Sequence, residues 1–128
     1  MKKDTIKRLG DAELEIMLII WEADEPVTSN YILEKLAGKR KWALSTLMTV
    51  LSRLTERRFL QCEKRERNYY SALVTEKEYK VKEGSLNLEK LYGNSISDLI
   101  TTLYKGKVIN NDDLEELRRF IDKISDEG

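Results

Sequence analysis

Histidine is absent from this sequence of 128 residues, and cysteine and proline each occur once. Without histidine, the chain lacks the commonest general base, the commonest metal ligand and the usual activator of a nucleophilic serine or cysteine. A single cysteine excludes an internal disulfide and a cysteine-cluster zinc site. The sequence therefore predicts no metal, no cofactor and no enzymatic activity, and it favours a binding protein.

Long hydrophobic runs are also absent. No apolar segment approaches the roughly 20 residues that cross a membrane, and residues 1–8 lack the apolar stretch of a signal peptide. We therefore expect a cytoplasmic protein with no membrane partner. Hydrophobic residues still make up 41% of the chain, which is enough for a modest core and argues against disorder.

The net charge is zero, because 23 basic residues balance 23 acidic ones, but the charges are unevenly distributed. Between Lys39 and Arg67 there are nine basic residues and three acidic ones, whereas residues 74–128 hold nine basic and 12 acidic ones. A basic stretch of this kind attracts a polyanion. Because the solvated face of an ordinary domain can carry the same bias, the position of these charges on helices and strands must decide.

The first part of the chain shows the periodicity of three amphipathic helices. The first begins at Asp11, which we take as its N-cap, and ends before Pro26. The second is short and has Thr28 or Ser29 as its cap, and a basic connector leads to a third helix over about residues 43–57. The apolar stripe of the third helix consists of Leu47, Val50, Leu51 and Leu54. The second and third helices thus form a candidate helix-turn-helix.

The periodicity then changes to that of strands. Residues 59–64 and 68–73 are typical of two short strands, and Arg65-Glu66-Arg67 between them predicts a hairpin with a basic tip. Three helices followed by a hairpin is the order of a winged helix. We therefore predict a mainly α fold in which residues 1–74 form a winged helix-turn-helix DNA-binding domain.

Residues 75–128 are expected to be helical again. The pattern predicts a polar helix from Glu76 to Tyr92 with an interruption at Gly84, a second helix that ends at Gly106, and a third that Asn110 or Asn111 caps. Helices this slender bury their apolar stripes poorly, so we predict a helical dimerisation domain that pairs with a second copy. Its predicted interface residues are Leu91, Ile96, Leu99, Ile100, Leu103, Leu114, Leu117, Ile121 and Ile124.

The outer face of the third helix carries the candidate site. Thr46, Thr49 and Arg53 form one stripe, and Ser45 and Ser52 flank it. Short side chains let a helix approach base edges in the major groove, a threonine methyl can contact a thymine methyl, and an arginine can bind guanine. Basic residues before and after the helix and at the hairpin tip can contact phosphates. The predicted DNA-contacting residues are Lys39, Arg40, Lys41, Trp42, Ser45, Thr46, Thr49, Ser52, Arg53, Arg65 and Arg67.

Several aromatic and sulfur-bearing residues have structural explanations. Trp21 lies on the apolar stripe of the first helix and is expected in the core, and packing under the third helix is favoured over a sugar-phosphate contact for Trp42. Tyr69 and Tyr70 alternate across a strand, so one should face the core and the other the surface. Cys62 is expected to be a small half-buried residue, because a single thiol has no resolving partner in the chain.

A set of short motifs runs through nearly the whole chain. They are Leu9-Gly10-Asp11-Ala12-Glu13-Leu14-Glu15-Ile16-Met17, Ile20-Trp21, Trp42 with Thr46-Leu47 and Leu51-Ser52-Arg53-Leu54, Tyr70, and Leu114-Glu115-Glu116-Leu117-Arg118. In this combination they resemble the penicillinase-repressor family of bacterial transcriptional repressors (the BlaI/MecI/CopY group).

The resemblance implies a winged-helix domain and a helical dimerisation domain, in homodimers that occupy palindromic operators in double-stranded DNA and block transcription of resistance or stress genes. Thr46, Thr49 and Arg53 match the family's recognition helix. The family usually has a lysine just before the first of these threonines and an arginine two residues after it, where this chain has Ser45 and Met48. The resemblance therefore implies the family's fold and mode of DNA binding. The differences at Ser45 and Met48 bear on which operator sequence is recognised.

Regulation in the family takes two forms. Copper-responsive members carry a repeated Cys-x-Cys pair near the C-terminus, and no cysteine follows Cys62 here, so metal sensing is excluded. Antibiotic-responsive members are cut by a sensor protease between an asparagine and a phenylalanine, and the corresponding bond here joins Thr102 to Leu103. A sensor protease is therefore a candidate partner, although the usual cleavage pair is absent.

Two other functions are compatible with the predicted fold. A winged-helix regulator of another type would bind a small ligand in a pocket beside the tail, and the sequence shows no cluster of polar groups to line one. A winged-helix protein-interaction module would not bind DNA and would show no salt-dependent DNA affinity.

Overall fold

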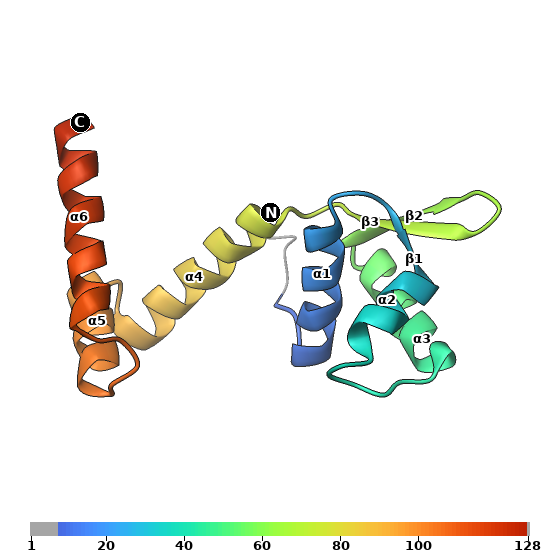
Figure 1. Ribbon diagram of the computed structural model, residues 1–128, viewed down its shortest axis with the longest axis horizontal. Helices are drawn as coiled ribbons and strands as arrows, with labels where there is room; N and C mark the ends of the chain where they lie inside the picture. Colours follow the sequence, from blue (N-terminus) through green and yellow to red (C-terminus); the bar gives the residue numbers. More distant parts are fainter. Residues whose placement is uncertain (1–7, 128) are drawn as a thin grey trace. The chain divides into compact units, whose positions relative to one another are not determined.

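The computed structural model describes residues 8–127, and this range contains six helices and three strands (Figure 1). In chain order they are α1 (Asp11–Ala23), β1 (Val27–Thr28), α2 (Ser29–Leu36), α3 (Leu44–Glu56), β2 (Leu60–Lys64), β3 (Asn68–Ala72), α4 (Glu76–Tyr92), α5 (Ile96–Lys105) and α6 (Asn111–Glu127). Residues 1–7, which are part of the predicted first domain, lie outside the described range. No helix within that range combines the length and apolar character needed to span a membrane.

The described residues fall into two compact units, one ending at Glu83 and the other beginning at Gly84. The first unit is a winged helix, as predicted. Its helix α2 packs against both α1 and α3, and β2 packs against α3. The largest fully buried side chains of its core are Phe59, Ile16, Met17, Ile32, Leu36, Leu47, Leu51, Leu54 and Leu60. Three of these leucines lie along one side of α3, which places the opposite side of this helix at the surface.

The strands of the first unit form one antiparallel sheet in the order β1-β3-β2. Strands β2 and β3 make the predicted hairpin, in which Cys62 is half-buried and lies opposite Tyr70. Strand β1 pairs Val27 with Tyr70; the sequence pattern does not predict it, because two residues are too few to show an alternation. Tyr70 is buried, which confirms that one of the two tyrosines faces the core, and Tyr69 is half-buried.

Capping signals fix the helix ends, with one correction. Helix α1 begins at Asp11, but its N-cap is Gly10, whose N–H donates to Oε1 of Glu13 at 2.9 Å. The prediction that Asp11 itself caps the helix is wrong by one residue, because Glu13 supplies the capping group from inside the helix. At α2, the Thr28 hydroxyl accepts the N–H of Tyr31 at 3.2 Å, so Thr28 is the cap.

Helix α4 is continuous from Glu76 to Tyr92, so the predicted interruption at Gly84 is wrong. Glycine in a helix costs only roughly 0.5–1 kcal/mol relative to alanine, which is too little to break a helix that is otherwise well formed. The N-terminus of α4 is held by a reciprocal cap: Thr75 Oγ1 accepts the N–H of Glu78 at 3.0 Å, and Glu78 Oε1 accepts the N–H of Thr75 at 2.8 Å.

The first turn of α4 belongs to the core of the first unit through Tyr79, which is 6% exposed. Its ring lies 6.0 Å from the ring of Trp21 and 6.2 Å from that of Phe59. Trp21 packs against the core as predicted, and its Nε1 donates to the carbonyl oxygen of Val74 at 2.8 Å. The compact unit thus includes the start of α4, whereas the division of function between residues 1–74 and 75–128 stays a prediction.

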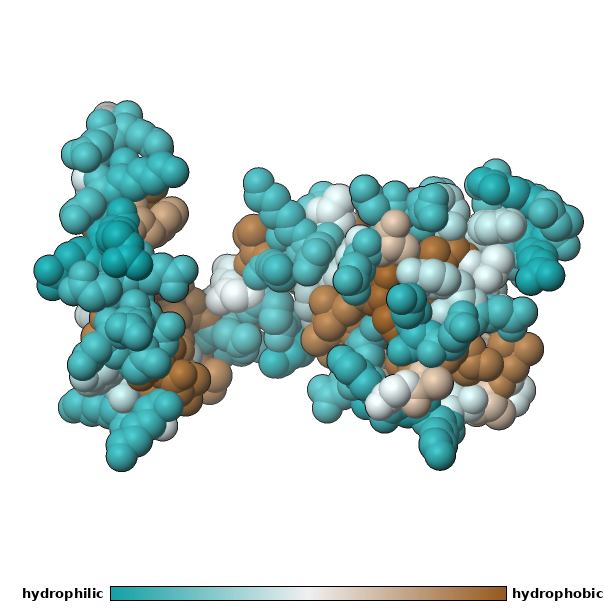
Figure 2. All heavy atoms as spheres, in the orientation of Figure 1, coloured by the Kyte–Doolittle hydropathy of each residue, from teal (hydrophilic) through white to brown (hydrophobic). Residues whose placement is uncertain are grey.

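Helices α5 and α6 lie in the second unit and contain no buried residue. Figure 2 shows apolar side chains at the surface of this unit. Of the predicted interface residues, Leu91, Ile96, Ile121 and Ile124 are exposed, and Leu99, Ile100, Leu103, Leu114 and Leu117 are half-buried. Val108 and Phe120 are further exposed apolar residues that the predicted set does not include. The second unit therefore exposes several large apolar side chains and fully buries none in α5 or α6.

The leucine stripe of α3 generates a stability prediction. Leu51→Ala should destabilise the first unit by about 2–5 kcal/mol, because the truncation leaves a cavity in a closed core. Urea unfolding followed by tryptophan fluorescence measures this loss, since Trp21 and Trp42 both lie in the first unit. Leu44→Ala is the matched control: the same truncation on the same helix, at a side chain that is 44% exposed, should cost much less. Equal losses from the two variants would contradict the assignment of the buried stripe.

Candidate functional site

The outer side of α3 brings together all five side chains that the sequence predicts there. Ser45, Thr46, Thr49, Ser52 and Arg53 are exposed, and they lie opposite the buried leucines of the same helix. Met48, at the position where the family resemblance expects an arginine, is half-buried against the core. The exposed face therefore consists of short polar side chains with one arginine near its C-terminal end.

The hydroxyl groups of α3 differ in their surroundings. Thr49 Oγ1 donates to the carbonyl oxygen of Ser45 at 3.1 Å and remains exposed. Thr55 Oγ1 makes the equivalent bond to the carbonyl oxygen of Leu51 at 2.8 Å, but Thr55 is half-buried. A bonded hydroxyl keeps oxygen lone pairs that can accept a further hydrogen bond, so the Thr49 hydroxyl stays available to a ligand.

The basic connector before α3 divides into two kinds of residue. Lys39 and Lys41 are exposed, and neither forms an ion pair with any residue in the described range. Arg40 instead binds Glu15 of α1, with Nε 2.7 Å from Oε1. The Arg40 guanidinium also lies 5.9 Å from the ring of Trp42, which packs against the core. The sequence predicts Lys39, Arg40, Lys41 and Trp42 as DNA contacts alike, whereas the structure pairs Arg40 with Glu15 and leaves both lysines exposed.

A similar arrangement lies at the other end of α3. Arg57, its C-cap residue, places Nη1 2.9 Å from Oε2 of Glu13 and donates from Nη2 to the carbonyl oxygen of Arg8 at 3.0 Å. Its guanidinium lies 5.1 Å from the ring of Phe59. Arg58, the next residue, is exposed. Ordinary sequence patterns do not reveal these pairings, because the partners lie far apart in the chain.

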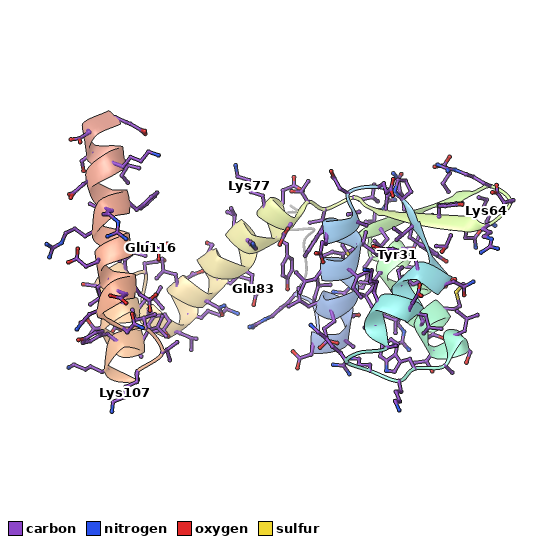
Figure 3. The ribbon with its side chains drawn as sticks, in the orientation of Figure 1. Tyr31, Lys64, Lys77, Glu83, Lys107 and Glu116 are labelled. Atoms are coloured by element: carbon purple, nitrogen blue, oxygen red, sulfur yellow. The ribbon has the colours of Figure 1, made fainter. Side chains whose placement is uncertain are left out.

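The hairpin tip carries the third group of cations. Lys64, Arg65 and Arg67 are all exposed, and Figure 3 shows Lys64 near the end of the hairpin. Arg65 lies 3.0 Å from Glu63 and 4.6 Å from the ring of Tyr69, so it is held along the strands. Lys64 is absent from the predicted set, and its place on the strand beside the tip is the signal that identifies it.

Two of the ion pairs lower the pKa of the carboxyl group that the arginine contacts. The pKa of Glu15 lies below its ordinary value, chiefly because the carboxylate accepts a hydrogen bond from Arg40, and the pKa of Arg40 is raised for the same reason. The hydrogen bond from Arg65 likewise lowers the pKa of Glu63. Since Glu15 has a lowered pKa in the folded state, its pair with Arg40 stabilises the fold above the ordinary glutamate pKa. This stabilisation is lost as the pH falls through the folded-state pKa.

Residues 9–123 match the family described as penicillinase repressor. The chain belongs to this family. The penicillinase repressor of Staphylococcus aureus is 31% identical over 115 residues, which cover 89% of this chain and 90% of that protein. The methicillin resistance regulatory protein MecI of Mammaliicoccus sciuri is 28% identical over 116 residues, which cover 90% and 94%. These matches confirm the family resemblance that the sequence motifs indicate.

A solved structure also matches this chain. The solution structure of monomeric BlaI from Bacillus licheniformis in complex with the blaP half-operator is 31% identical, with a TM-score of 0.51. The match covers 62% of this chain and 94% of the BlaI chain. It supports the winged-helix assignment of the first unit.

The pair of Arg40 and Glu15 generates a pH prediction. Arg40→Gln should raise the pKa of Glu15 toward its ordinary value, because the variant removes the hydrogen bond and charge that lower it. An NMR titration of the side-chain carboxyl carbons measures the change. Lys41→Gln is the control, since Lys41 is exposed and is not among the charges that shift Glu15. A Glu15 pKa that stays the same in Arg40→Gln would show that the pair does not form in solution.

Proposed function

We propose that this penicillinase repressor family member represses transcription by binding double-stranded operator DNA as a homodimer, through the outer face of α3. One observation carries the proposal. Helix α3 buries three leucines along one side and exposes short polar side chains along the other, and exposed basic residues precede and follow the helix in the chain. The family match supports it, as does the BlaI relative, which was solved with a half-operator.

The outer face of α3 has the chemistry of major-groove recognition. Serine and threonine side chains are short, so the helix axis can come close to the base edges. Thr46 and Thr49 offer hydroxyls for hydrogen bonds and methyl groups for thymine, and Arg53 can donate two hydrogen bonds to a guanine. Arg53 makes no ion pair within the described range that would compete for its guanidinium.

The exposed cations around α3 supply phosphate contacts. Lys39 and Lys41 precede the helix, Arg58 follows it, and Lys64 and Arg67 lie beside the hairpin tip. Such contacts fix the position of a protein on the duplex and make its affinity depend on salt, because each one releases counterions. Arg65 keeps the phosphate role predicted for it, although it must share its guanidinium with Glu63.

A second copy of the chain is the natural partner of the second unit. Helices α5 and α6 bury no residue within one chain, and Phe120 and Ile121 of α6 are 57% and 48% exposed. Pairing the same surface in two copies would bury these side chains by one symmetric interface. The resulting dimer would present two α3 helices to two half-sites.

Operator binding has consequences for where and how the protein acts. Repression by occupying an operator requires no bond-breaking chemistry, so we infer a non-enzymatic protein that works where bacterial DNA is found, in the cytoplasm. This role requires neither a metal nor a cofactor.

A sensor protease would have to cut inside a helix. The bond between Thr102 and Leu103 lies within α5, and the Thr102 carbonyl oxygen accepts the N–H of Gly106 at 2.9 Å. Leu103 is half-buried. Proteolysis generally requires local opening of such a segment, so we propose that cleavage at this bond would depend on unwinding of α5.

The recognition face generates a binding prediction. Thr49→Val keeps the threonine methyl group and replaces the hydroxyl with a second methyl. We expect operator affinity to fall by about 0.5–1.5 kcal/mol, the usual net value of one hydrogen bond. Fluorescence anisotropy measures it on a duplex that footprinting defines in the DNA upstream of the gene. The matched control is Thr55→Val, which removes the equivalent hydroxyl from the half-buried side of α3 and should leave affinity unchanged. If Thr49→Val bound the operator as tightly as the parent and Thr55→Val lost affinity, the proposed recognition face of α3 would be wrong.

The second unit generates an assembly prediction. The double variant Leu117→Asp, Ile121→Asp should be monomeric, because each new carboxylate would be buried without a partner in an apolar interface. Sedimentation velocity at micromolar concentration should show a dimer for the parent. Ser125→Asp, which adds one charge at an exposed polar position of α6, should remain a dimer. A monomeric parent would overturn the dimer proposal.

A further inference from the structure

Two arginines beside α3 differ from the other cations of the site, because α1 already holds them. The guanidinium of Arg40 meets the Glu15 carboxylate with both Nε and Nη2, at 2.7 and 3.5 Å. Arg57 meets Glu13 at 2.9 Å, and the side chains of Arg40 and Arg57 are 32% and 29% exposed. The Arg65 side chain at the hairpin tip is 45% exposed.

We propose that Arg40 and Arg57 are positioning residues for DNA recognition: they fix the two ends of α3 to α1 and do not bind phosphate. The inference rests on the proposed function and deepens it. It reassigns Arg40 from the predicted phosphate contacts to the framework that aims the recognition helix.

The geometry of α1 explains how one helix can hold both ends of α3. Glu13 and Glu15 are two residues apart, and two residues of an α-helix turn by roughly 200°. Their side chains therefore leave α1 in nearly opposite directions. One reaches the connector that leads into α3 and the other reaches its C-cap residue. Helix α2 packs against both α1 and α3, and the two ion pairs add direct links from α1 to the segments at the two ends of α3.

Charge compensation separates these arginines from the phosphate-binding cations. A guanidinium paired with a carboxylate adds little to the potential that attracts DNA, and it must give up that partner before it binds a phosphate. Arg57 would have to release three partners, namely the Glu13 carboxylate, the Arg8 carbonyl oxygen and the Phe59 ring. Lys39 and Lys41 have no ion pair to release within the described range.

The segment that Arg57 contacts before α1, Arg8 and Leu9, also binds residues of α4. The Arg8 guanidinium lies 2.8 Å from Glu83, which Figure 3 labels on α4, and the N–H of Leu9 donates to the Tyr79 hydroxyl at 2.9 Å. The segment before α1 is therefore fixed on two sides, by α3 and by α4. A firmly held segment is a suitable anchor for a helix that must keep its angle in a groove.

A positioning residue and a phosphate-contacting residue affect different measured quantities in DNA binding, namely sequence preference and salt dependence. Loss of a phosphate contact weakens binding to all sequences about equally and lowers the salt slope by about one per protomer. Loss of a positioning contact misaligns α3, which lowers the preference for operator over random duplex and leaves the salt slope unchanged. Anisotropy titrations with the footprinted operator and a random duplex of the same length, over a range of salt concentrations, measure both quantities.

We expect Arg40→Gln to reduce the ratio of operator to random affinity by about two- to fivefold, in keeping with one partly exposed ion pair, with no change of slope. Glu15→Gln should reduce the ratio of operator to random affinity by a similar factor, because it also breaks the pair with Arg40. This loss is expected even though removal of a negative charge by itself favours DNA binding. Lys41→Gln should leave the ratio unchanged and lower the slope. Arg57→Lys accompanies these variants in case Arg57→Gln fails to fold, and it should lose preference because a lysine cannot span the same three partners.

The outcomes separate the two proposals. A lowered slope with an unchanged ratio in Arg40→Gln would overturn the positioning role and leave DNA binding intact. A higher ratio in Glu15→Gln would do the same, since it would mean that Glu15 withholds Arg40 from the DNA. A parent protein that shows no salt-dependent DNA affinity would overturn the proposed function itself. Circular dichroism of each variant without DNA confirms that the winged helix is folded under the assay conditions.

Discussion

Burial of three leucines along one side of α3 is the constraint on which the recognition site depends. Leu47, Leu51 and Leu54 have no exposed surface, and full burial of each such side chain contributes about 1.5–3 kcal/mol. With the inner side held in this way, the outer side needs no role in stability. It can therefore consist of serines and threonines, which contribute little to a fold but let a helix approach another surface closely.

The features that the sequence predicts correctly are those that depend only on residues close together in the chain. The stripe of α3 repeats within two turns, Thr28 caps α2 from the adjacent residue, and the basic tip lies between two short strands. Each needs only local periodicity or a local hydrogen bond. The exposed face of α3 follows from the same repeat, because burial of one side of a helix defines the other.

The features that the sequence does not predict depend on tertiary contacts. The pairs of Arg40 with Glu15 and of Arg57 with Glu13 join residues 25 and 44 positions apart, and the tertiary packing of the first unit brings them together. The same holds for Tyr79, which looks like part of a polar helix in the sequence and is buried against Trp21 and Phe59. Continuity of α4 through Gly84 likewise reflects the cap at Thr75 and the packing of Tyr79.

The sharing of α4 between the two units affects how the second unit could be exchanged for another domain by recombination of the gene. Many multidomain proteins carry a flexible linker where recombination can join one domain to another without damage to either. Here the first unit ends within a continuous helix, at Glu83, and the second begins at the next residue. An exchange of the second unit for another would have to preserve the helical phase of α4 and keep Tyr79 in its place. Gly84, the first residue of the second unit, has open space around the position of a Cβ, so a larger side chain would fit at this boundary without a clash.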